Sequence, residues 1–237
     1  MKVYYDFHIH SCLSPCGDND MTPNNIVNMA ALKGLDAIAI TDHNCGHNAR
    51  AAIEAASELP ITVIPGMEIE TAEDVHMVAL FPTVESMEKM QDIVLAHLPP
   101  VKNKPALFGE QIIMDKHDNV IEFKEQFLIT ACSLSVYEVT QKVREYGGVV
   151  FPAHIDKTSY SILSNLGSIP EELNFSTVEI KNSPIPQNLL DMGVTDKYNI
   201  LCNSDAHYLW DISEKEHYIE CESLSIGDIL HKISEYI

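Results

Sequence analysis

The chain has 237 residues, 46% of them hydrophobic, with 35 acidic against 15 basic side chains and a net charge of −20. This length and apolar content suffice for one full core, within the range that α/β barrels occupy as single domains. Without a Lys/Arg cluster to neutralise phosphates, the sequence predicts no duplex DNA or RNA partner. It also lacks a leader pattern and an apolar run of the roughly 18 residues that span a bilayer, so we expect no membrane contact and a cytoplasmic location.

The first half of the chain alternates predicted strands and helices. A strand over 4–11 precedes a helix over 23–34, where Thr22 suits the N-cap, Pro23 the first helical position and Gly34 the stop. A buried strand over 35–40 completes a β-α-β unit, which predicts a parallel sheet or barrel. The alternation continues with a helix over 48–59, a strand over 61–69 interrupted at Pro65-Gly66, a strand over 75–81 and a helix over 84–98.

The alternation breaks at about 99–130, where prolines and charged residues predict turns and short helices near one rim. The pattern then resumes with helices over 136–146 and 159–166, strands over 149–153, 177–180 and 198–203, an edge strand over 217–221 and a last helix over 225–236. We therefore expect one domain over 1–237 with an insertion or lid at about 99–130. The sequence does not indicate an oligomeric state.

Residues that bind metals recur near the predicted strand ends. His8 and His10 share one face of the first strand, and Asp205 with His207 repeats this spacing near the last one. Further ligand-type residues at or near strand termini are His43, Glu68, His76 and His154. Strand ends meet at one mouth of an α/β barrel, so we expect these side chains to converge on one cavity. Imidazole and carboxylate ligands suit zinc, manganese or iron better than calcium.

The order of these motifs resembles that of the PHP family, named for polymerase and histidinol phosphatase. The segments that carry the resemblance are Asp6-Phe7-His8-Ile9-His10-Ser11, Ile40-Thr41-Asp42-His43, Pro65-Gly66-Met67-Glu68, Val75-His76-Met77, Pro152-Ala153-His154 and Asn203-Ser204-Asp205-Ala206-His207. The resemblance implies a distorted seven-stranded (β/α) barrel, phosphoesterase activity and two or three divalent transition metal ions, zinc, manganese or iron.

The resemblance also implies three groups of ligands. The first group is His8, His10, Glu68 and Asp205. The second, to which Glu68 would bridge, adds His76 and His154. The third is His43, His207 and one residue from the loop after the first strand. In that loop Ser14-Pro15-Cys16-Gly17-Asp18 replaces the family's usual Ser-Asp-Gly. For the third ligand of this group, counting back from Pro23 favours Asp18 and counting forward from His8 favours Cys16. Asp20 is a further candidate.

Phosphoester hydrolysis is the function that these residues predict. A metal-bridging hydroxide would attack phosphorus in line, with Glu68, Asp205 and His207 as catalytic residues. Divalent ions would create a local positive potential inside an otherwise acidic protein. This potential favours a small phosphorylated metabolite as the substrate, such as a nucleotide, a nucleoside bisphosphate, or a sugar or amino-alcohol phosphate. An amidohydrolase-type metal hydrolase and a non-catalytic PHP regulatory module are the alternatives.

Four further residues could bind the substrate. Arg50, Lys157 and Lys181 follow strand ends and could hold a phosphate, and His47 could protonate the leaving group. Arg50, Lys157 and Lys181 are each at least as often solvated surface charges. Asp6 shares a strand face with His8 and could orient its imidazole.

Overall fold

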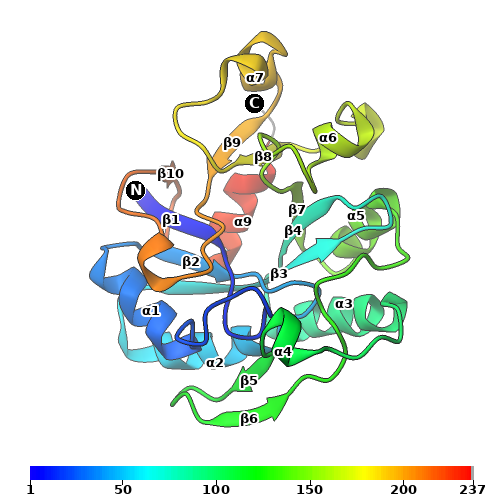
Figure 1. The fold of residues 1–237 in the computed structure, drawn as a ribbon. Helices are drawn as coiled ribbons and strands as arrows, with labels where there is room; N and C mark the ends of the chain where they lie inside the picture. The colour runs from blue at the N-terminus through cyan, green and yellow to red at the C-terminus, as the bar shows by residue number, and fades with distance from the viewer. Residues whose placement is uncertain (236–237) are drawn as a thin grey trace.

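The computed structural model describes residues 1–235 as an α/β fold with a curled sheet of six strands (Figure 1). In sheet order these strands are β10 (Tyr218–Glu220), β1 (Lys2–Ile9), β2 (Ala37–Ile40), β3 (Thr62–Glu70), β4 (His76–Leu80) and β7 (Val149–Pro152). Two further pairs are β5 (Ile112–Met114) with β6 (Val120–Phe123), and β8 (Thr177–Ile180) with β9 (Asn199–Cys202). No helix within these residues is long and apolar enough to cross a bilayer.

Most helices lie close to their predicted positions, whereas two short ones between β8 and β9 were not expected. The helices are α1 (Pro23–Leu32), α2 (His47–Ala55), α3 (Val84–His97), α4 (Pro105–Phe108), α5 (Val136–Glu145), α6 (Ile162–Leu166), α7 (Gln187–Asp191), α8 (Val194–Lys197) and α9 (Ile226–Ser234). Short 3-10 turns are η1 (Ala56–Glu58), η2 (Glu171–Leu173) and η3 (Leu209–Asp211). Thr22 caps α1 by accepting a hydrogen bond from the Asn25 N–H, as expected. Tyr236, in the predicted last helix, lies outside the described residues.

The expectation of an all-parallel sheet is wrong for the strands that follow β3. Strands β1, β2 and β3 are parallel, whereas β4 is antiparallel to both β3 and β7. The link over 71–75 is far shorter than the dozen or so residues that a parallel crossover needs, so β4 must turn back along β3. This reversal places His76 opposite Glu70, two residues from Glu68.

The predicted interruption at Pro65-Gly66 is also wrong, because β3 continues through it and begins to pair with a second strand there. Pro65 is in register with Ile40 of β2, and Gly66 begins the pairing with β4. A Cβ at Gly66 would lie 2.9 Å from the Ala79 carbonyl oxygen, so glycine permits the close approach of β4. The second half of β3, which carries Glu68, can therefore pair with β4 on one edge while its other edge stays bonded to the residues after β2.

The β8–β9 pair is separate from the six-stranded sheet but linked to it on both sides, through β7 and through β1. The Ile155 N–H after β7 donates to the Glu179 carbonyl at 2.8 Å. After β9, Ala206 bridges in parallel to Ile9 of β1. The fold is thus a curled half-barrel with a two-stranded pair beside it, and closure into an exact seven-stranded barrel stays a prediction.

The segment at about 99–130 contains α4 and the β5–β6 hairpin, where only turns and short helices were expected. The hairpin lies at the lower edge of Figure 1, beyond α2, and β6 is exposed. Strand β5 is tied to the body because the Ile112 N–H donates to the Cys12 carbonyl and the Met114 N–H donates to Asn48. A single domain over 1–237 and a lid role for this segment stay predictions.

Apolar side chains of the sheet and of α9 pack together in a second hydrophobic cluster. Phe7, Phe151 and Ile229 are fully buried there, so we expect Phe151→Ala to lower the free energy of unfolding by about 3–5 kcal/mol through lost burial and a cavity. Urea denaturation measures this loss. Leu32→Ala, at a residue 81% exposed, is the control and should change stability by less than about 0.5 kcal/mol. A loss below about 1 kcal/mol for Phe151→Ala would contradict tight packing of the ring.

Candidate metal centre

Glu68 lies at the middle of a buried histidine cluster. Its Oε1 faces three ring nitrogens: His8 Nε2 at 3.3 Å, His76 Nδ1 at 2.8 Å and His154 Nε2 at 3.2 Å. Its Oε2 faces two: His10 Nε2 at 3.4 Å and His43 Nδ1 at 3.0 Å. Because the two oxygens face different sets of nitrogens, the geometry suits a carboxylate that bridges two cations.

The fold around β3 explains how these side chains meet. The Glu68 N–H donates to the Asp42 carbonyl, and His43 forms a parallel bridge with Glu68, which extends the β2–β3 pairing. His8 and His10 come from the adjacent β1 and the residue after it. His154 follows β7, which pairs with β4. Side chains from several strand ends therefore lie together around Glu68, and their role as metal ligands stays a prediction.

Asp205 and His207 reach the same cluster from the segment after β9. Asp205 Oδ1 lies 3.2 Å from His10 Nε2 and 3.6 Å from His8 Nε2. The His10 N–H donates to the Ala206 carbonyl at 3.0 Å, which holds this segment against β1. Asp205 has a φ of 49° and His154 a φ of 28°, in the left-handed region that most residues avoid. Such conformations are frequent at functional sites, where surrounding contacts maintain them.

The ring nitrogens of His8 and His10 face each other in a way that favours a cation between them. His8 Nδ1 lies 2.9 Å from Glu179, and His10 Nδ1 lies 3.0 Å from Ser14 Oγ, whose own proton goes to Asp42. With both Nδ1 atoms as donors, the two Nε2 atoms, 3.2 Å apart, are the ones left to bind a cation. A divalent ion would take the place of any proton held between them.

Unpaired buried atoms also fit a metal centre. Among residues 1–235, His43 Nδ1 and Glu68 Oε2 are buried side-chain atoms without a hydrogen bond. Three sets of potential ligands have donor atoms within 4.8 Å of each other: His8-His10-Glu68, His43-Glu68-His76 and His10-His43-His207. Imidazole and carboxylate donors of this kind are typical of sites for first-row transition metals.

Charges in the cluster keep its two central carboxylates ionised. Burial alone would raise the pKa of Glu68, but His76, His8 and His43 outweigh it and hold that pKa well below the usual range. Burial likewise opposes ionisation of Asp205, whose pKa is lowered chiefly by His8 and His10. The cluster therefore presents negative oxygens among imidazoles, an arrangement that attracts cations.

The loop after β1 brings Cys16 into the cluster and leaves Asp18 outside it. Cys16 Sγ lies 3.1 Å from His207 Nε2, and His43 and His207 outweigh desolvation to lower the thiol pKa to about 7. Asp18 instead accepts a hydrogen bond from the Asp20 N–H within its own turn. Counting back from Pro23 favours Asp18, but turns between 11 and 21 fold the chain back on itself and place the Cys16 side chain against His207 instead.

The predicted substrate-binding residues divide into two pairs. Lys157 Nζ lies 2.5 Å from Asp205 Oδ2, and Lys181 Nζ lies 3.4 Å from the same oxygen. Arg50 instead pairs with Glu88 on the surface at 2.9 Å. His47 contacts Cys45 and Gln91 and does not line the cavity over the cluster. The structure therefore removes Arg50 and His47 from the candidate site.

Glu179 is a site residue that the sequence reasoning missed. It lies in β8, 1% exposed, and accepts hydrogen bonds from His8 Nδ1, the His154 N–H and Asn203 Nδ2. It thus orients His8, the role expected of Asp6. Asp6 instead accepts from the Ser204 and Ser213 N–H groups. The signal that could have identified Glu179 was an acidic residue inside a short strand predicted to be buried.

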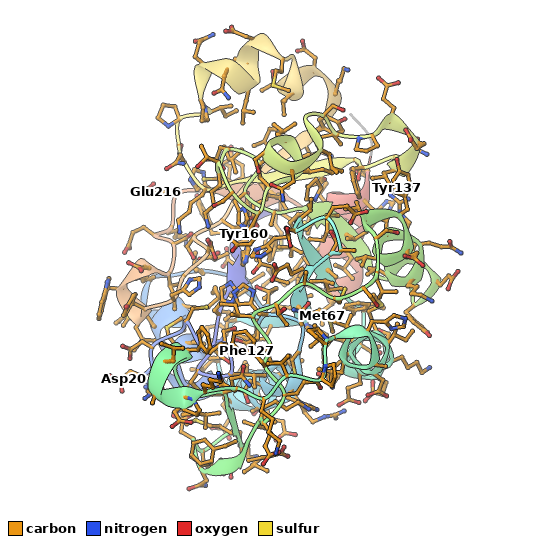
Figure 2. All side chains as sticks on the ribbon, turned by 45° about the vertical axis from the view of Figure 1, so that its right-hand side comes forward. Asp20, Met67, Phe127, Tyr137, Tyr160 and Glu216 are labelled. Atoms are coloured by element: carbon orange, nitrogen blue, oxygen red, sulfur yellow. The ribbon has the colours of Figure 1, made fainter. Side chains whose placement is uncertain are left out.

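A cavity of about 310 Å³ opens over the cluster. Its walls include residues that the sequence analysis did not select: Glu70, Ile129, Ser159 and Tyr160. Burial raises the pKa of Glu70 to about 7. The half-exposed Tyr160 stacks on His76 and is labelled near the middle of Figure 2. These residues are the ones that a substrate bound at the cluster would meet.

Known proteins resemble this chain in parts of their length. The 5'-3' exoribonuclease Rnm of Salmonella typhimurium is 37% identical over 87 residues, which are 33% of this chain and 27% of that protein. Endonuclease Q of Pyrococcus furiosus matches 99% of this chain and 56% of its own, with a TM-score of 0.73 and 19% identity. Endonuclease Q in complex with a 27-mer duplex carrying an abasic lesion matches 98% of this chain and 56% of its own, with a TM-score of 0.69 and 19% identity.

The expectation of a small phosphorylated substrate and no duplex DNA or RNA partner is contradicted. A protein of the same fold has been solved on a DNA duplex, and a curated relative is an exoribonuclease. Net charge is a sum over the whole protein surface. A bound nucleic-acid strand is affected mainly by charges within about 8–10 Å, because salt screens those that lie farther away. Lys157 and Lys181 lie at the centre, so the overall −20 does not decide what binds there.

The family of the chain follows from a match over more than half of its length. The model of the PHP domain matches residues 6–149. This range includes the second half of β1 and all of β2 to β4, and with them His8, His10, His43, Glu68 and His76. The chain belongs to the PHP family of metal-dependent hydrolases.

Proposed function

We propose that this chain hydrolyses phosphodiester bonds of nucleic acid with divalent metal ions held by the Glu68 cluster. The observation that carries the proposal is the environment of Glu68, whose two buried oxygens face separate sets of histidine nitrogens. Such an arrangement is suited to two cations a few ångströms apart, the pattern that metal-dependent phosphoryl transfer uses. The exoribonuclease and endonuclease relatives support nucleic acid as the substrate class.

The roles of the residues follow from their positions. His8, His10, Glu68, His76, His154 and Asp205 would hold two ions, and Cys16, His43 and His207 a third. Bound divalent ions supply an activated water and neutralise charge on the phosphoryl group. Glu179 holds His8 in the tautomer that binds metal. Lys157 and Lys181 add positive charge beside Asp205, where a phosphate oxygen can replace part of their present pairing.

A hydrolysis assay tests the function directly. Protein purified without chelator is incubated with end-labelled single-stranded RNA, single-stranded DNA and duplex DNA, with added zinc, manganese or iron(II). We expect cleavage of at least one nucleic acid, its loss in EDTA and its return with metal. Absence of cleavage with every metal would overturn the proposal. Turnover confined to amides or deaminase substrates would favour the amidohydrolase alternative. Fewer than about two equivalents of bound metal per chain would favour a non-catalytic module.

Cys16 gives this chain a thiolate in the third ligand group, and zinc binding tests that assignment. We expect Cys16→Ser to remove one zinc equivalent and the sulfur neighbour at about 2.3 Å in the zinc-edge X-ray absorption spectrum. Cys202→Ser, at a half-buried cysteine outside the cluster, is the matched control and should retain both. Asp18→Asn should also leave the spectrum unchanged. A sulfur neighbour that survives Cys16→Ser would contradict the assignment.

A further inference from the structure

We propose that Tyr160 is a stacking surface for the base of the substrate nucleotide, and that the cavity takes one unpaired nucleotide at a time. This inference rests on the proposed nuclease function and specifies the form of nucleic acid that the centre accepts. Tyr160 lies outside the proposed ligand set. Its ring stacking, the loop that holds the ring and the size of the cavity support this role.

The Tyr160 ring lies directly beside the metal centre. It stacks on the His76 ring with centroids 4.8 Å apart and an interplanar angle of 25°, and His76 Nδ1 is 2.8 Å from Glu68. Tyr160 nevertheless remains 48% exposed and lines the cavity. An aromatic ring that is supported on one side and reachable on another is the form that proteins use to stack nucleobases.

The loop that carries Tyr160 is held in place at several points. The Tyr160 carbonyl accepts the His76 N–H at 2.9 Å, and Tyr160 has a φ of 56°, in the left-handed region. Ser161 caps α6 and donates its hydroxyl proton to the Lys157 carbonyl. A non-glycine residue kept in this conformation by its neighbours is typical of functional loops. The ring is therefore presented at a fixed place rather than on a free tip.

The same loop offers the two chemical groups that a nucleotide needs. Lys157 reaches Asp205 on one side of the cluster, and Tyr160 covers His76 on another. A phosphate near the metal ligands would meet the ammonium group, while the attached sugar and base extend toward the aromatic wall. Ile129 adds an apolar side chain to the cavity.

The size of the cavity limits what can enter. Its volume of about 310 Å³ lies at the low end of the roughly 300–1,000 Å³ typical of small-ligand sites. That space suits a single nucleotide unit and not a base pair with both strands. A duplex must therefore present a strand end or an extruded nucleotide, as enzymes that act on single bases require.

Matched oligonucleotides separate base stacking from mere support of His76. The substrates are labelled single strands of one sequence, each with a single abasic residue at a different position. They are assayed with the metal ion that supports cleavage by the wild-type protein. We expect Tyr160→Ala to reduce kcat/KM for the fully based strand about 5- to 150-fold, equivalent to about 1–3 kcal/mol of base stacking. It should change kcat/KM less than about 2-fold when the abasic residue occupies the cavity, since no base remains to stack.

Two variants control for the ring itself. Tyr160→Phe keeps the aromatic face and should retain near wild-type kcat/KM on both strands. Tyr137→Ala removes a similarly exposed tyrosine at the outer edge of Figure 2, bonded to Glu172, and should have no effect. An equal loss on based and abasic strands, or no loss with Tyr160→Ala, overturns the stacking role alone. Failure of the wild-type protein to cleave any strand overturns the nuclease function as well.

Discussion

Turnover is expected to fall at least about a thousandfold when Glu68 is replaced by Gln, because an amide cannot bridge two cations as a carboxylate does. Glu68 is 1% exposed and contacts five imidazoles, so its charge has no solvent substitute. Bound metal should fall below two equivalents. Initial rates on the cleaved oligonucleotide and elemental analysis of the purified variant measure the two effects.

The same substitution on the exposed β6 strand, Glu122→Gln, controls for the loss of one negative charge. It should retain wild-type rates and metal content. Thermal unfolding of Glu68→Gln without metal should show a folded protein, since removing a buried charge also removes its desolvation cost. Wild-type turnover with two equivalents of metal in Glu68→Gln would exclude the bridging role.

Metal affinity is expected to fall about 10- to 100-fold when Glu179 is replaced by Ala, although we do not propose that Glu179 touches the metal. The substitution removes the acceptor that orients His8 Nδ1 and leaves the His154 N–H and Asn203 Nδ2 without their partner. Titration calorimetry with manganese or zinc measures the affinity. Glu179→Gln keeps an acceptor oxygen and should lose less.

Stability separates the two roles that Glu179 could have. A structural role alone would lower the free energy of unfolding and leave the metal dissociation constant unchanged, and that outcome would contradict the positioning role. Measurement of unfolding without metal and of binding on the folded fraction distinguishes the cases. We expect both quantities to change, because His8 orientation and burial of the polar network depend on the same carboxylate.

The cluster was predictable from sequence where ligands follow the ends of apolar strands. His43 and His154 each follow such a run, and strand ends in α/β folds meet at one edge, so spacing alone brought them together. The loop ligand was not predictable by counting, since Cys16 and Asp18 are two residues apart and the turns decide which faces inward. The partner of His8 was missed because Glu179 and β1 are distant in sequence.

The strand pattern predicted the six strands of the main sheet, gave β4 the wrong direction, and missed the β5–β6 hairpin, α7 and α8. Periodicity identifies β4 as a strand, but direction depends on the length of the link before it, and the link over 71–75 leaves room only for a reversal. The net charge of −20 was likewise given too much weight when duplex DNA and RNA were excluded as partners. A net charge describes the average surface, whereas the lysines beside Asp205 determine the field at the centre.

The bridge between Ile9 and Ala206 makes assembly of the centre a late event during synthesis. The histidines around Glu68 can gather once the first two thirds of the chain has emerged from the ribosome, but Asp205 joins His8 and His10 only after β9 has been made. Contacts of such long sequence separation form slowly. Ion uptake by the growing chain would therefore be stepwise, and detachment of the segment after β9 would be the route by which a finished molecule loses its metal.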